Sequence, residues 1–151
     1  MKRGSWYGYE VEIDEEATRD WYAQAEAWDC GCGHCRNFLA LARERRLPAE
    51  VLGLLDGLGI PPEKATFVCA YYTEKEKGLD YQFSWRMAGR ILSPEIGMER
   101  MGPGIRFPWG KMEIGHEKYP YGAPGFPEPH FDLECFMFLP WVLDEPLEGT
   151  E

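Results

Sequence analysis

The chain has 151 residues and a formal net charge of −10 at pH 7, and 44% of its residues are hydrophobic. This length suits one domain, 1–151, with enough apolar side chains to bury a core. Because an acidic protein repels phosphate groups, the composition argues against nucleic acid and anionic membranes as partners and leaves an unknown protein or small-molecule ligand.

The N-terminal half combines one strand-like segment with three helical ones. Alternating side chains predict a strand over 5–13, and Asp14 is a suitable N-cap for a helix over 15–28. A second helix is expected from Cys35 to Arg46. Pro48 begins a third helix, which Gly59 ends as a C-cap.

The second half reads as strands and loops. Segments 65–73 and 81–92 flank the polar turn 74–80 and predict a hairpin. Residues 93–129 are rich in Pro and Gly, with a strand expected within GIRFPWGKMEIG, and 130–142 is the last strand. Segregated helices and strands predict an α+β fold, an antiparallel sheet with a small N-terminal helical subdomain packed on one face.

No targeting segment is visible in the sequence, so a cytoplasmic location is expected. The start MKRGSWYGYEVEIDEE lacks the apolar core of a signal peptide, and the apolar run CFMFLPWVL is too short for a membrane span. Cytoplasmic thiols stay mostly reduced. Five cysteines are also an odd number, which cannot all pair within one chain.

The stretch DCGCGHCRNF is the main chemical lead, because it gathers Cys30, Cys32 and Cys35 within six residues. Thiolates are good zinc ligands, and a structural zinc site needs four ligands. The fourth ligand could be His116 or His130, which lie in or beside the loop-rich segment. We expect the side chain of His34 to point away, because it is adjacent to Cys35.

Two other interpretations of this stretch stay open. CGHC at 32–35 matches the active-site tetrapeptide of protein disulfide isomerases, so Cys32 and Cys35 could form a thiol oxidoreductase or redox switch. No βαβ pattern surrounds the motif, which weakens that hypothesis. Alternatively, the three cysteines pack as small apolar residues in a helix–helix turn.

Three further features have both a functional and a simpler structural interpretation. Cys69 and Cys135 are expected to be buried core thiols that could be neighbours in the sheet. His130, Asp132 and Glu134 alternate on one strand face, which could bind a cation or could simply face solvent. The aromatic loop 107–131 could form a peptide- or sugar-binding interaction module or could cover the core.

Three motifs together resemble a family of small uncharacterised bacterial proteins. They are the W-x-C-x-C-x-x-C-x-N-F pattern from Trp28 to Phe38, the segment YPYGAPGFPEPHFDLE, and LPWVLDEP at 139–146. The resemblance implies a bacterial origin and no established activity. Relatives often carry an acidic residue at position 34, which implies that His34 is not an essential ligand.

Without a recognised catalytic motif, we expect a non-enzymatic binding or accessory protein rather than an enzyme. Its cofactor, if it has one, would be zinc at Cys30, Cys32 and Cys35.

Overall fold

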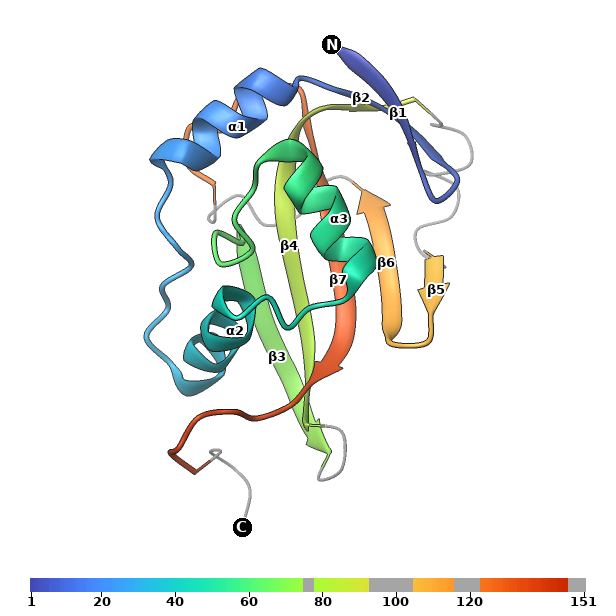
Figure 1. Ribbon diagram of the computed structural model, residues 1–151. Coiled ribbons are helices and arrows are strands. Elements are labelled where there is room, and N and C mark those ends of the chain that lie inside the picture. The colour runs from blue at the N-terminus through green and yellow to red at the C-terminus, as the bar shows by residue number, and fades with distance from the viewer. Residues whose placement is uncertain (75–77, 93–104, 116–122, 147–151) are drawn as a thin grey trace.

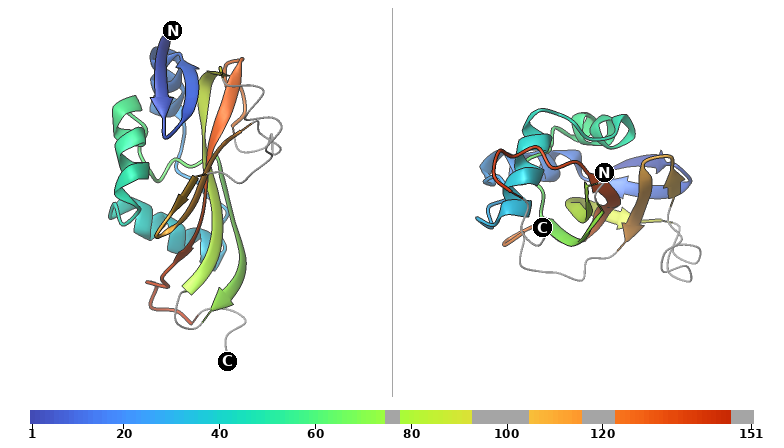
Figure 2. Two further views of the ribbon diagram at one scale, coloured as in Figure 1. Left: turned by 90° about the vertical axis from the view of Figure 1, so that its right-hand side faces the viewer. Right: turned by 90° about the horizontal axis from the view of Figure 1, so that it is seen from below.

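The computed structural model describes residues 1–74, 78–92, 105–115 and 123–146. Within these residues, three helices pack on one face of a seven-stranded sheet, which confirms the predicted α+β fold (Figures 1 and 2). The elements are β1 (Lys2–Trp6), β2 (Tyr9–Ile13), α1 (Glu15–Gln24), α2 (Gly33–Arg43), α3 (Ala49–Leu58), β3 (Phe67–Glu74), β4 (Gly78–Ile91), β5 (Ile105–Phe107), β6 (Gly110–Gly115) and β7 (His130–Leu139).

Strand β4 is the central strand of this sheet and pairs with β2, β3 and β7. The strand order is β1-β2-β4-β7-β6-β5, every pair is antiparallel, and β3 also pairs with β4. Two strands pair along one edge of β4: β3 with its first residues and β2 with its last residues, 89–91. The other edge pairs with β7 over ten residues, from Leu79↔Leu139 to Ala88↔His130.

The N-terminal segment folds as a hairpin, whereas the sequence predicted one strand over 5–13. Tyr7 and Gly8 both have positive φ, 51° and 96°, which is the backbone of a tight two-residue turn. Strands β1 and β2 pair on either side of this turn, from Trp6↔Tyr9 to Lys2↔Ile13. Segment 104–115 likewise holds two strands, β5 and β6, where one was expected.

The helix caps explain where the helices begin and end. Asp14 caps α1 as predicted, since its carboxylate accepts a hydrogen bond from the Ala17 amide at 3.0 Å. The helix ends at Gln24 rather than at 28. Gly59 ends α3 as predicted, with a φ of 69° and the Ile60 amide donating to the Leu55 carbonyl.

The strand alternation places the core between the sheet and the helices. On β4, the side chains of Tyr81, Phe83, Trp85 and Met87 are fully buried. The ring centroid of Phe38 of α2 lies 5.0 Å from that of Phe83.

The predicted 65–92 hairpin is confirmed as β3 and β4. Strand β7 ends at Leu139, before Pro140, because proline cannot donate to the sheet. No helix of the described residues is long and apolar enough to cross a membrane.

Candidate metal centre

The three clustered cysteines meet at the start of α2. Their sulfur atoms all lie within 4.8 Å of one another, and the Cys30 and Cys32 sulfurs are 3.1 Å apart. Four thiolates around zinc, each at ~2.3 Å, would be ~3.8 Å apart in a tetrahedron. The observed spacing brackets that value, so the triad is compatible with a metal site.

The backbone around the cluster is shaped by glycine and by the helix start. Gly31 has a φ of 79°, a left-handed conformation that glycine adopts without strain. Cys32 is the N-cap of α2 and its side chain makes no capping hydrogen bond, which leaves its sulfur facing its neighbours. Arg36, one turn into α2, donates to the Gly31 carbonyl at 2.7 Å and so closes the turn.

The three thiols differ in exposure. Cys30 is exposed, Cys32 is half-buried, and Cys35 is 1% exposed. Burial raises the pKa of the Cys35 thiol, whereas hydrogen bonds from the Cys32 and Cys35 side chains lower the pKa of Cys30. The cluster therefore runs from the protein interior to the surface, with one sulfur accessible to solvent.

Trp28 contributes a hydrogen bond that the sequence did not predict. Its indole nitrogen donates to the Cys35 sulfur at 3.1 Å, and its ring packs against Phe67 of β3. The sequence placed Trp28 on the apolar face of a helix over 15–28. Since α1 ends at Gln24, Trp28 instead lies in an extended segment, held where its amide donates to the Glu63 carbonyl.

His34 does not point away from the cluster, contrary to the expectation from sequence. Its Nε2 atom lies 3.4 Å from the Cys32 sulfur. The backbone of His34 is held by Tyr81 of β4, whose hydroxyl donates to the His34 carbonyl at 2.6 Å. A histidine two residues after Cys32 was the available signal in the sequence, but its adjacency to Cys35 argued against it.

Asn37 fixes α2 against the end of β7. This buried side chain donates to the Pro140 carbonyl at 3.0 Å and accepts from the Val142 amide at 2.8 Å. It also donates to the Tyr81 hydroxyl at 3.3 Å. The cluster therefore rests on a helix whose position is set by the sheet.

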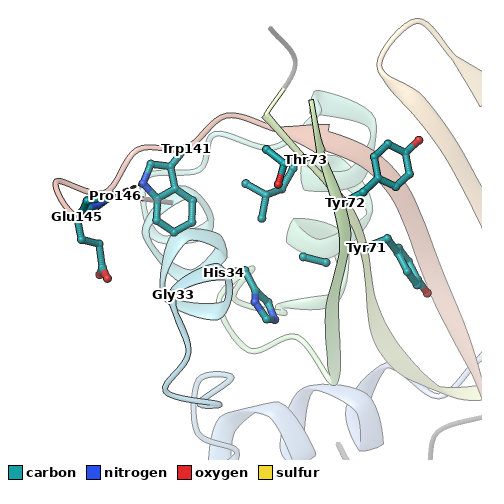
Figure 3. A pocket seen from close by; sticks show the side chains of 10 residues that line it. Gly33, His34, Tyr71, Tyr72, Thr73, Trp141, Glu145 and Pro146 are labelled. Atoms are coloured by element: carbon teal, nitrogen blue, oxygen red, sulfur yellow. Dashed lines mark hydrogen bonds between the residues drawn. The ribbon is translucent and has the colours of Figure 1, made fainter. Parts of the chain in front are cut away.

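A pocket of about 190 Å³ adjoins the cluster through His34. Figure 3 shows its walls, with His34 and Trp141 on one side and β3 on the other. The Tyr71 and Tyr72 rings point away from His34 and Trp141 in this view. The Trp141 indole donates to the Glu145 carbonyl at 2.7 Å, and a Cβ on Gly33 would come within 3.3 Å of the Trp141 ring.

Of the two histidines predicted as possible fourth ligands, the structure describes only His130. His116 lies outside the described residues. His130 begins β7, whereas the His34 carbonyl beside the cluster is held by Tyr81, which pairs with Met137 near the other end of that strand. The structure therefore brings the three thiols together and does not bring His130 to them.

The two remaining cysteines are not neighbours in the sheet. Cys69 pairs with Gln82 and Cys135 pairs with Phe83, which are adjacent residues of β4, so the two thiols point to opposite faces. Cys135 is fully buried, as predicted. Cys69 is only half-buried, because it lies on the face that the helices do not cover.

The strand face of His130, Asp132 and Glu134 is less exposed than the solvent face favoured from sequence. Asp132 is 1% exposed, and its carboxylate lies 3.4 Å from the Arg86 guanidinium. Glu134 accepts a hydrogen bond from Gln82 at 3.3 Å. Both acids therefore interact with side chains of the neighbouring strand β4.

The described part of the aromatic loop 107–131 packs on the domain. Phe126 and Phe131 are buried, with Phe126 against Trp21 of α1. Phe107 and Trp109 stack at 4.9 Å, and the Trp109 indole donates to Glu50 of α3. Tyr119 and Tyr121 lie outside the described residues.

Comparisons of this chain with protein-family models, with curated proteins and with solved structures gave no match.

Proposed function

We propose that this protein is a non-enzymatic binding or accessory protein in which Cys30, Cys32 and Cys35 hold a zinc ion. The observation that carries the proposal is the convergence of three sulfurs within 4.8 Å of one another. A disulfide would use two of these thiols and leave the third unexplained, whereas a zinc ion uses all three. A cytoplasmic location, which is part of the proposal, would keep the thiols reduced.

The zinc ion would have a structural role at this place in the fold. It would join the extended segment after α1, which carries Cys30, to the first turn of α2, which carries Cys35. Zinc binding can contribute directly to folding free energy when the ligands come from a segment with few other contacts. Cys30 belongs to such a segment, because its side chain is exposed.

Metal content and thiol reactivity, measured on one sample purified without chelator, test the proposal. We expect about one equivalent of zinc per chain, and the bound zinc should protect the clustered thiols from modification. A strong chelator should remove the zinc and make these thiols reactive. Cys32→Ser should lose the metal. Cys69→Ser is the matched control, because it removes a half-buried thiol outside the cluster and should retain zinc.

Two outcomes would count against zinc. Less than about a tenth of an equivalent, with the three clustered thiols freely reactive, would remove the basis of the proposal. A metal-free protein that instead forms a reversible disulfide between two of these cysteines would support the redox hypothesis. The Cys30 and Cys32 sulfurs, which are 3.1 Å apart, are a candidate pair for that chemistry beside the Cys32 and Cys35 of the CGHC motif.

A further inference from the structure

The three thiols leave one position of a tetrahedral zinc ion without a protein ligand. We infer that His34 supplies this fourth ligand through Nε2, so that a Cys₃His site is built entirely from residues 30–35. This inference rests on the proposed zinc site and names the ligand that completes it. Its carrying observation is the short distance between a ring nitrogen and one of the three sulfurs.

The observed distance fits a shared metal ion. Zinc bonds of ~2.3 Å to sulfur and ~2.0 Å to nitrogen place the two ligand atoms ~3.6 Å apart in a tetrahedron. His34 Nε2 lies 3.4 Å from the Cys32 sulfur. The His34 nitrogen is not part of the group of ligand atoms that lie within 4.8 Å of one another, so the ring would have to turn towards Cys30 and Cys35 to share the ion.

This rotation would involve the side chain of His34 alone. The backbone is fixed, because the Tyr81 hydroxyl donates to the His34 carbonyl at 2.6 Å. The side chain borders the pocket of about 190 Å³ next to the cluster, between the start of α2 and β3 (Figure 3). Because the backbone is held, the imidazole would reach the metal by side-chain rotation, without a shift of the helix.

The other candidate ligands near the cluster are less suitable. Glu145 is paired with the Arg36 guanidinium at 2.5 Å and would have to give up that ion pair. Asp29 precedes Cys30 and is exposed to water, which competes for its carboxylate. An imidazole is also a better partner for zinc among thiolates than a solvated carboxylate, and Cys₃His is a common set of structural zinc ligands.

The experiment compares the full-length wild-type protein, His34→Ala and the control Asp29→Asn. Zinc affinity is measured by competition with a chromophoric chelator, and X-ray absorption identifies the ligand atoms. We expect the wild-type spectrum to contain three sulfurs and one imidazole nitrogen. His34→Ala should lower zinc affinity by at least about tenfold, whereas Asp29→Asn should change it less than about twofold.

Cobalt substitution separates the loss of the imidazole ligand from the loss of the whole metal site in a variant that folds poorly. Sulfur-to-cobalt charge-transfer bands report the three thiolates, so their retention in His34→Ala shows an intact sulfur cluster, while the d–d bands should shift as imidazole is lost. A wild-type protein that binds zinc without an imidazole signal, or through four sulfurs from two chains, would overturn the inference and leave the zinc proposal standing. A wild-type protein without zinc would overturn the proposed function itself.

Discussion

Trp28 is the residue that connects the thiol cluster to the hydrophobic core. Its ring packs against Phe67 while its N–H points at Cys35, so one side chain contacts both the sheet and the cluster. Hydrogen bonds from neighbouring groups orient metal ligands and stabilise the ligating form of the side chain. Trp28 would thus act as a positioning residue for Cys35 in the proposed zinc site.

Trp28→Phe tests this role by removing the donor and keeping an aromatic ring. One hydrogen bond contributes about 0.5–1.5 kcal/mol, so zinc affinity should fall severalfold, up to about tenfold. Chelator competition measures the change. Trp109→Phe is the control, because it removes an indole donor that binds Glu50 far from the cysteines. Equal affinities of the two variants would contradict a role for the Trp28 N–H.

At the scale of the elements, the β2–β4 contact depends on one glycine. Gly89 has a φ of 143° and lies opposite Ile13 on the edge of β4 that pairs with β2 and β3. A Cβ at this position would come 1.9 Å from the Glu12 carbonyl oxygen, which is a backbone atom that cannot swing aside. The N-terminal hairpin can therefore join the sheet only if residue 89 has no side chain.

Gly89→Ala should lower the free energy of unfolding by about 3 kcal/mol or more, since it combines a backbone clash with an unfavourable φ. Gly53→Ala is the matched control within α3, where an added Cβ meets nothing within 4 Å. That variant should be about 0.5–1 kcal/mol more stable than wild type, because alanine favours the helix. Denaturant unfolding of both variants measures the difference, and a neutral Gly89→Ala would show that the hairpin can shift.

Helix ends that are marked by local contacts were predictable from the sequence, whereas the end of α1 and the turn of the N-terminal hairpin were not. Asp14 and Gly59 mark helix ends through contacts within one turn, and both were predicted. The turn at Tyr7 and Gly8 was missed because the flanking residues continue one alternation. The thiol cluster followed from spacing alone, whereas the contacts of Trp28 and His34 depend on where α1 ends and α2 begins.

At the scale of the whole molecule, α2 is held between the sheet and the C-terminal segment by two kinds of contact. Asn37 makes the buried one, with hydrogen bonds to Pro140 and Val142. Arg36 makes the exposed one, an ion pair with Glu145. Both contacts join residues more than a hundred positions apart, so they tie the end of the described chain to the helix that carries Cys35.

Asn37→Leu and Arg36→Gln separate the energies of these two contacts. The leucine leaves the Pro140 carbonyl and the Val142 amide without their partner, so Asn37→Leu should cost about 2–4 kcal/mol of unfolding free energy. Arg36→Gln breaks an exposed pair and should cost about 1 kcal/mol or less. Hydrogen exchange at the Val142 amide provides a local readout, which should accelerate strongly in Asn37→Leu and little in Arg36→Gln. Equal acceleration in both variants would mean that the C-terminal segment is held mainly by surface charge.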